Sequence, residues 1–189
     1  LSNSSPIMID VTISNNTCFW GDGHGNANGG GMSLYYSHPI ITDVTIENNS
    51  IWGDYTSYGA GMHLLGSSPI LTNVTIKNNT ASGSNAVGGA GITIHNGSYP
   101  ILKNVMIVNN ESSDGVYHRG GGIGMYTSDP TLINVTISEN TADIFGGGIY
   151  VSSSDPTFTN VTISENTSNS GGGMNLNSSD PTMTHVTIS

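Results

Sequence analysis

The sequence predicts an all-β fold in which short parallel strands stack into a solenoid. A segment that begins with proline and ends in Val-x-Ile recurs at intervals of 33, 30, 31, 30, 26 and 25 residues. Each copy continues into an asparagine and, further on, into glycines. Repeats of this length that carry alternating apolar residues are typical of solenoids, whose neighbouring coils bury one continuous core. The copies start at Pro6, Pro39, Pro69, Pro100, Pro130, Pro156 and Pro181.

The repeat over residues 130–151 indicates how one coil is built. Apolar residues alternate with polar ones around Leu132, at 135–138 and at 147–151. Such alternation gives a strand one inward and one outward face. We therefore expect about six complete coils of 25–33 residues, each with three short strands. Because the repeat is unbroken, residues 1–189 are expected to form a single domain, as a segment or protomer of a longer or end-to-end stacked solenoid.

One asparagine follows the second strand in every complete coil. Stacked amides can hydrogen-bond along such a column, which favours a structural ladder over a binding role. The glycine clusters lack the lysine of a phosphate-binding loop, so tight corners and close approach of coils explain them better. The predicted ladder consists of Asn16, Asn49, Asn79, Asn110, Asn140 and Asn166.

The charge balance excludes some partners. Only three residues are Lys or Arg against thirteen Asp or Glu, for a net charge of -10. Nucleic acid is not an expected partner because phosphates need cations, and no apolar run is long enough for membrane insertion. We expect an extracellular or cell-surface protein. Four Asn-x-Ser/Thr sites are candidates for glycosylation there: Asn15, Asn48, Asn78 and Asn96.

The loops between the asparagine column and the glycine corner are longest in the first half of the chain and hold unusual residues. Stacked aromatic and acidic side chains there can form a sugar-binding platform, or the rings can simply pack against the solenoid. The candidate ligand-binding residues are Trp20, Asp22, His24, Trp52, Asp54, Tyr55, Tyr58, Asp114, Tyr117 and His118. Calcium is the one cofactor considered, with Asp22, Asp54 and Asp114 as its ligands.

The residue after each proline predicts a contact surface. It is isoleucine in four successive coils, at Ile7, Ile40, Ile70 and Ile101, and threonine thereafter. If the next residue points inward, these four side chains form an exposed apolar stripe, which a partner or a second copy would cover. We therefore expect self-association, either side by side or end to end.

The repeat Pro-Thr-Leu-x-Asn-Val-Thr-Ile-Ser-x-Asn-Thr-Ala…Gly-Gly-Gly-Ile, at residues 130–149, resembles right-handed parallel β-helix proteins of the pectate-lyase-like superfamily. It is also similar to repeats of polymorphic outer-membrane autotransporters. The resemblance implies a right-handed β-helix but no single activity. We expect a structural or adhesive rod or filament subunit that contacts a polysaccharide or other glycan. The alternative is a carbohydrate-binding module, polysaccharide lyase or glycoside hydrolase, although no residue stands out as catalytic.

Overall fold

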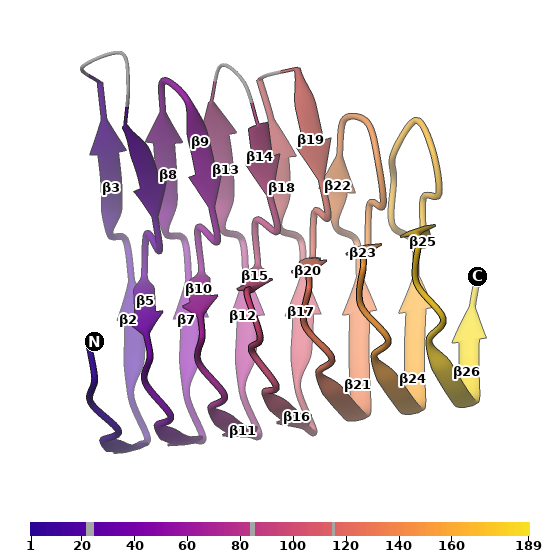
Figure 1. Ribbon diagram of the computed structural model, residues 1–189, viewed down its shortest axis with the longest axis horizontal. Coiled ribbons are helices and arrows are strands. Elements are labelled where there is room, and N and C mark those ends of the chain that lie inside the picture. The colour runs from indigo at the N-terminus through magenta and orange to yellow at the C-terminus, as the bar shows by residue number, and fades with distance from the viewer. Residues whose placement is uncertain (22–24, 84–85, 115) are drawn as a thin grey trace.

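The computed structural model describes the chain except for residues 22–24, 84–85 and 115. The described residues form strands, turns and bends that wind into a solenoid with its coils stacked along the long axis (Figure 1). Every strand pairs in parallel with the equivalent strand of the neighbouring coil, and equivalent residues lie opposite each other, as in Ile70 with Ile40 and Ile101. The expected all-β parallel solenoid is confirmed.

The strands of the described residues belong to four sheets. The large sheet contains β1 (Ile7–Ile9), β2 (Thr12–Ser14), β6 (Ile40–Thr42), β7 (Thr45–Glu47), β11 (Ile70–Thr72), β12 (Thr75–Lys77), β16 (Ile101–Lys103), β17 (Met106–Val108), β21 (Thr131–Ser138), β24 (Thr157–Ser164) and β26 (Thr182–Ile188). The six-stranded sheet contains β5 (Met32–Tyr35), β10 (Met62–Leu65), β15 (Ile92–His95), β20 (Ile123–Tyr126), β23 (Ile149–Ser152) and β25 (Met174–Asn177).

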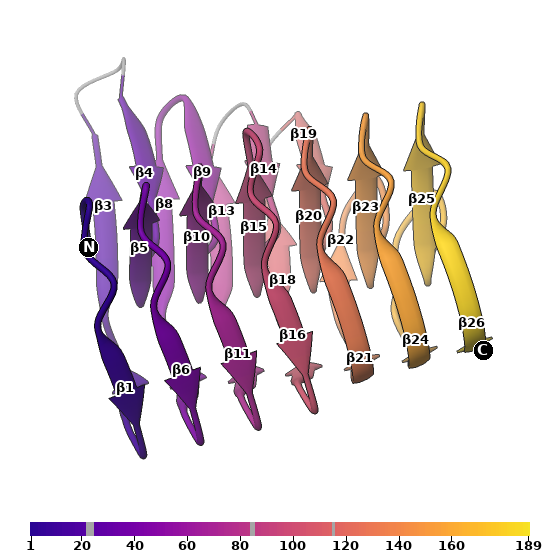
Figure 2. The same cartoon turned by 60° about the horizontal axis from the view of Figure 1, so that its bottom comes forward.

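The two remaining sheets form arches that rise above the solenoid (Figures 1 and 2). The five-stranded sheet is the ascending side, with β3 (Thr17–Trp20), β8 (Ser50–Gly53), β13 (Thr80–Gly83), β18 (Glu111–Ser113) and β22 (Thr141–Ala142). The four-stranded sheet is the descending side, with β4 (Asn26–Asn28), β9 (Thr56–Tyr58), β14 (Ala86–Gly88) and β19 (Tyr117–Arg119).

The strand count per coil differs from the expected three. Where the loop after the asparagine is long, its two halves pair with the loops of neighbouring coils, so the first four coils have five strands each. Where the loop is short, the first two strands merge into β21 or β24. Residue 167 makes only an isolated bridge to Thr141. The five-stranded sheet therefore closes about five turns, slightly fewer than the expected six.

The main core lies between the large sheet and the six-stranded sheet. It consists of the inward columns of valine, isoleucine, leucine and methionine, including Val74, Ile76 and Met62, each almost fully buried. A second, narrower core fills the arches with small side chains and one isoleucine, Ile51. The small residues allow the two arch sheets to approach closely.

The asparagine column forms a continuous ladder along one edge of the main core. From Asn16 to Asn166, each Nδ2 donates to the Oδ1 of the next asparagine at 2.9–3.0 Å. The same Oδ1 also accepts the backbone N–H of the preceding asparagine at 2.9–3.0 Å. From Asn49 onward, Nδ2 donates further to a strand carbonyl of the preceding coil. The ladder thus satisfies the buried polar groups of a repeated turn.

Candidate functional site

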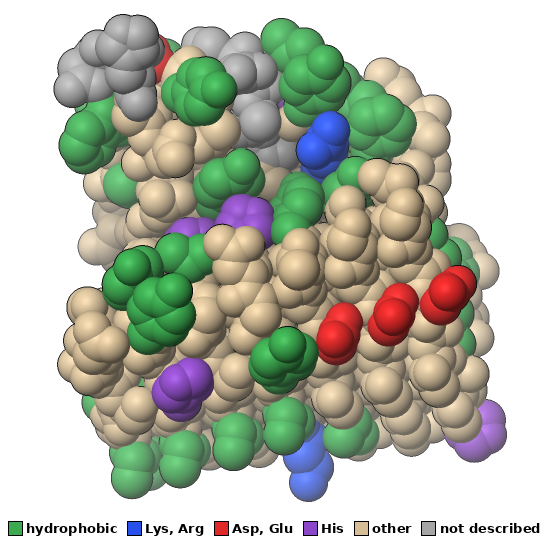
Figure 3. Space-filling view, in the orientation of Figure 1, with side chains coloured by type: hydrophobic (Ala, Val, Ile, Leu, Met, Phe, Trp, Pro, Cys, Tyr) green, Lys and Arg blue, Asp and Glu red, His purple; other side chains and the backbone are tan. Residues whose placement is uncertain are grey.

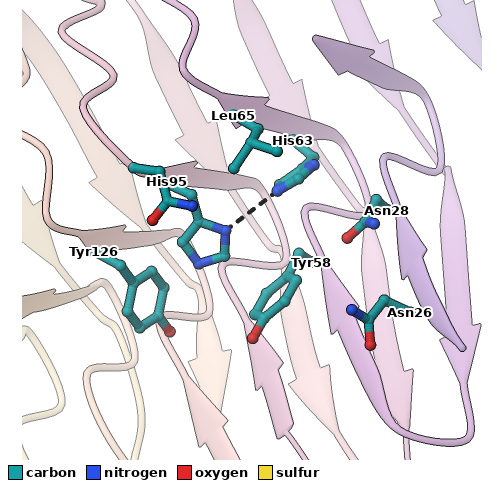
Figure 4. A pocket seen from close by; sticks show the side chains of 8 residues that line it. Asn26, Asn28, Tyr58, His63, Leu65, His95 and Tyr126 are labelled. Carbon is teal, nitrogen blue, oxygen red and sulfur yellow. Dashed lines mark hydrogen bonds between the residues drawn. The ribbon is translucent and has the colours of Figure 1, made fainter. Parts of the chain in front are cut away.

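A glycine corner joins the four-stranded sheet to the six-stranded sheet in each coil. Gly120 has a φ of 72°, and a Cβ on it would lie 2.2 Å from the carbonyl oxygen of Ile123. The left-handed φ and the lack of room for a Cβ together require glycine here, so Gly120 fixes where the chain turns. A hollow of about 360 Å³ lies between the outer faces of the two sheets beside these corners. Its lining residues are Asn26, Asn28, Tyr58, His63, Leu65, His95, Asn96 and Tyr126 (Figure 4).

Strand alternation explains which side chains reach the hollow. Met62 and Leu64 of β10 point into the main core, so His63 and Leu65 face outward. On β9, Ser57 is fully buried inside the arch, which turns Tyr58 toward β10 and β15. In Figure 3, histidine and hydrophobic side chains gather below the arches in this part of the surface.

Two histidines and a tyrosine form the centre of the hollow. Nε2 of His63 and Nδ1 of His95 are hydrogen-bonded at 3.2 Å. The Tyr58 ring stacks on His63 with centroids 5.9 Å apart and meets His95 edge-on at 4.4 Å. Burial and the neighbouring imidazole lower the pKa of His63 to about 3, and burial lowers the pKa of His95 to about 4. Both imidazoles are therefore neutral at physiological pH, and one shares its proton with the other.

The Tyr126 ring extends the cluster of Tyr58, His63 and His95, and it fits there because two neighbouring residues are glycines. A Cβ on Gly88 would lie 2.7 Å from the Tyr126 hydroxyl, and one on Gly124 would lie 3.1 Å from its ring. The ring centroid is 4.6 Å from His95 and 5.7 Å from Tyr150. Burial raises the pKa of the Tyr126 phenol far above its ordinary value, so the hydroxyl stays protonated and can donate a hydrogen bond.

Arg119 lines a second hollow further along the solenoid. Its guanidinium lies 5.2 Å from the ring centre of Tyr117 and 5.3 Å from that of Tyr150. The second hollow has a volume of about 310 Å³ and adjoins Arg119 and Tyr150. The two hollows therefore follow the same sheet junction, one after the other along the solenoid. The second is lined by Arg119, Phe145, Tyr150, Asn175, Leu176 and Asn177.

We call the two hollows together the groove. Of the ligand-binding residues predicted from the loops that the structure describes, Tyr58 is the one that lines it. Trp52 lies on the outer face of the five-stranded sheet, where it stacks on Phe19 with centroids 4.9 Å apart. Trp20 and Tyr55 are about half exposed on the arches, and Tyr117 is exposed on β19. None of these side chains lines either hollow, and Phe19 with Trp52 is the one ring pair among them that the structure shows within the described residues.

Other predicted residues do not join a single site. His118 is completely buried inside the arch, so it does not present its imidazole to a ligand in solution. Asp54 and Asp114 belong to arches two coils apart, and Asp22 and His24 lie outside the described residues. Among the residues that the structure places, no group of three or more His, Cys, Asp or Glu side chains is arranged to hold a metal ion. Calcium binding that includes Asp22 stays a prediction.

The groove residues that sequence reasoning missed lie on the strands and not on the loops. Aligning the repeats could have found most of them, because aromatic and histidine rings replace small residues at the outward positions after the glycine corner. The fragments Met-His-Leu-Leu, Ile-Thr-Ile-His, Ile-Gly-Met-Tyr and Ile-Tyr-Val-Ser are equivalent in register. The missed residues that such an alignment would find are His63, His95, Tyr126 and Tyr150. Arg119, at the end of β19 before the corner, was missed and carries no such signal.

The side chains of the predicted glycosylation sites Asn15, Asn48, Asn78 and Asn96 are exposed. The first three repeat one residue before the asparagine ladder, each with a positive φ, and Asn96 borders the groove. A glycan on Asn15, Asn48 or Asn78 would project into solvent, whereas one on Asn96 would lie at the first hollow. None of the residues placed by the structure forms a helix capable of crossing a membrane.

A comparison with known proteins identifies the family of this chain and the handedness of its β-helix. The sequence matches the family described as "Right handed beta helix region" over residues 1–189. The chain belongs to this family. The right-handed β-helix expected from the repeats is therefore confirmed along the whole sequence. No curated protein matches this β-helix significantly.

Proposed function

We propose that this right-handed β-helix is an extracellular adhesive protein that binds a glycan in the groove between its four-stranded and six-stranded sheets. The observation that carries the proposal is the unbroken line of rings from Tyr58 through His95 and Tyr126 to Tyr150, with centroid separations of 4.4, 4.6 and 5.7 Å. Flat rings with polar edges suit a sugar, whose C–H faces pack on aromatic faces while its hydroxyls need hydrogen-bond partners.

The polar groups of the groove support the same ligand class. Amide side chains, which both donate and accept hydrogen bonds, surround the rings at Asn26, Asn28, Asn96, Asn175 and Asn177. The side-chain oxygen of Asn28 is buried and has no hydrogen-bond partner within the described part of the chain. A hydroxyl donor from a ligand would satisfy this oxygen. Each hollow also has the volume of a small-ligand site.

Charge favours a ligand without strong negative charge. The chain has a net charge of -10, so a polyanion is repelled at long range. The first hollow is lined by no Lys or Arg among the described residues, and the second by Arg119, whose guanidinium is already engaged with two tyrosine rings. A neutral oligosaccharide therefore fits the groove better than a polyuronate.

The rigid scaffold supports an adhesive role in preference to catalysis. Neither hollow is lined by Asp or Glu, so the described groove does not offer the carboxylate pair that glycoside hydrolysis needs. The asparagine ladder and the zero-shift strand register hold successive coils at a fixed spacing, which suits a rod that presents a binding surface. The catalytic alternative predicts product release from the polysaccharide and is tested by the same experiment.

Isothermal titration calorimetry with neutral gluco-, manno-, xylo- and chito-oligosaccharides tests the proposal. We expect saturable binding to one of these series, weakened at least about fivefold by Tyr58→Ala, which corresponds to the roughly 1 kcal/mol of a ring contact. Tyr99→Ala is the matched control, because Tyr99 is 56% exposed and lies outside both hollows. Absence of binding to all four series, or equal loss with both variants, contradicts the proposal. New reducing ends or unsaturated products would instead support the enzyme.

A further inference from the structure

A flat apolar surface lies on the first strands of the first four coils, on the large sheet and away from the groove. Ile7, Ile40, Ile70 and Ile101 alternate with buried residues on β1, β6, β11 and β16, and they are 67%, 45%, 43% and 41% exposed. Strand register places them directly beside one another. We call these four side chains the isoleucine stripe. Figure 3 shows a row of hydrophobic side chains along the lower edge, where Figure 1 places β11 and β16.

The stripe ends abruptly at the fifth coil. The next residue in the same column is Thr131, followed by threonine in the two coils after it. The equivalent position thus changes from apolar to polar while the fold stays the same. Fold stability alone gives no reason for exposing four isoleucines in place of threonines, because both residue types are β-branched and suit strands. A contiguous exposed apolar row indicates a contact surface.

The charges beside the stripe are arranged to match a second copy. Lys103 is on the fourth coil, two residues beyond Ile101, and within the described residues the one ion pair joins Lys77 to Glu47 instead. The two acids in the exposed column that follows these strands are Asp10 and Asp43, on the first and second coils. In the third and fourth coils the same column holds Asn73 and Asn104. The cation and the acids therefore lie toward opposite ends of the stripe.

We propose that the stripe is a face-to-face interface between two copies of this chain, related by a two-fold axis that runs along the strands between the second and third coils. This rotation reverses the solenoid axis but keeps the column order. Ile7 then meets Ile101 of the second copy, and Ile40 meets Ile70. Lys103 then lies opposite Ile9 of the second copy, which occupies the same column, and its ammonium reaches the next residue, Asp10, to form an ion pair at each rim. The surface is self-complementary, as a two-fold interface requires.

The size of the surface sets the strength of the association. Four coils at about 4.8 Å and five residues at about 3.3 Å cover roughly 320 Å² on each copy. This area is below the roughly 800 Å² per partner of a standard stable interface. The dimer is therefore weak and reversible, with dissociation in the micromolar range or above, and it forms where the protein is concentrated or anchored at a surface.

Sedimentation velocity over micromolar to millimolar concentrations tests the interface. We expect a reversible monomer–dimer equilibrium whose dissociation constant rises at least about tenfold in Ile70→Lys, because each dimer then buries two ammonium groups in its apolar centre. Thr157→Lys is the matched control. It places the same charge in the same column two coils beyond the stripe, and it should leave the equilibrium unchanged. Thermal unfolding of both variants verifies that the exposed substitutions keep the fold.

The orientation is tested separately by charge exchange. Lys103→Glu and Asp10→Lys should each weaken the dimer, and the double variant should restore it, because the pair is re-formed with its signs reversed. A monomer at all concentrations, or equal effects of Ile70→Lys and Thr157→Lys, overturns the interface. If Ile70→Lys dissociates the dimer but the charge exchange does not restore it, the proposed arrangement with the two solenoid axes reversed is wrong.

Discussion

Replacing the buried ladder residue Asn110 with alanine should destabilise the β-helix far more than replacing the exposed ladder residue Asn16. Asn110 is 1% exposed. Its Oδ1 accepts hydrogen bonds from the backbone N–H and from Nδ2 of Asn79 at 3.0 and 2.9 Å. Its own Nδ2 donates to Oδ1 of Asn140 at 2.9 Å and to the carbonyl of Ile76 at 3.1 Å. Nδ2 also donates to the carbonyl of Val108 at 3.2 Å, so alanine removes five interactions.

The expected loss in free energy of unfolding follows from the polar groups that Asn110→Ala leaves without hydrogen-bond partners. The buried backbone N–H of Asn79 loses its acceptor, which costs about 1–3 kcal/mol. The four other lost bonds contribute about 3 kcal/mol together, because three of them share the two Nδ2 hydrogens. Water entering the small void recovers part of this, so we expect a loss of about 3–5 kcal/mol. The matched control is Asn16→Ala, because Asn16 is exposed and its Nδ2 donates to Asn49 and Ser14 where water can replace it. The control should cost less than about 1 kcal/mol.

Urea unfolding followed by circular dichroism measures both variants against the parent chain. Because solenoids can unfold in parts, the slope of the transition must be compared as well as its midpoint. Indistinguishable midpoints for Asn110→Ala and Asn16→Ala would show that the ladder adds no stability beyond that of an exposed asparagine, and the reasoning from buried partners would be refuted.

Three further outcomes follow from individual contacts. Gly120→Ala should lower the free energy of unfolding by several kcal/mol, and Gly97→Ala by about 1 kcal/mol. Both glycines have positive φ, but only at Gly120 would the added Cβ meet backbone atoms. Thermal unfolding of the two variants therefore separates backbone strain from steric clash. Between pH 7 and pH 5 the free energy of unfolding should fall by up to about 4 kcal/mol more than it does in the double variant His63→Gln/His95→Gln. The reason is that histidines of the unfolded chain take up protons below about pH 6.5, whereas the folded ones, with pKa values of about 3 and 4, do not. This stability is fully present above pH 6.5 and is lost as the pH falls; an unchanged difference between the two proteins across that range would contradict it. Lys77→Met should shift the free energy of unfolding by no more than about 0.5 kcal/mol, because its 3.1 Å ion pair is partly exposed, and a larger loss in urea unfolding would contradict this.

The sequence by itself determined the solenoid and its inward columns. A repeat of 25–33 residues leaves equivalent residues in register, so Val74, Ile76 and Asn79 could be assigned to stacked columns before any coordinates were known. Side-chain alternation also placed the isoleucine stripe on the outside. These inferences depend on local geometry and on the repeat, both of which are written in one coil and copied to the next.

Tertiary structure decided where the outward side chains meet. The loops were expected to be strand-free, but their length lets them pair with one another and rise as arches, which turns Tyr58 toward His63 and His95. Tyr58 and His63 are close in the sequence, but strand alternation within one sheet does not show that the outward faces of two different sheets meet across the glycine corner. The groove is thus a product of two sheets in contact, while the core and the ladder are properties of a single repeated coil.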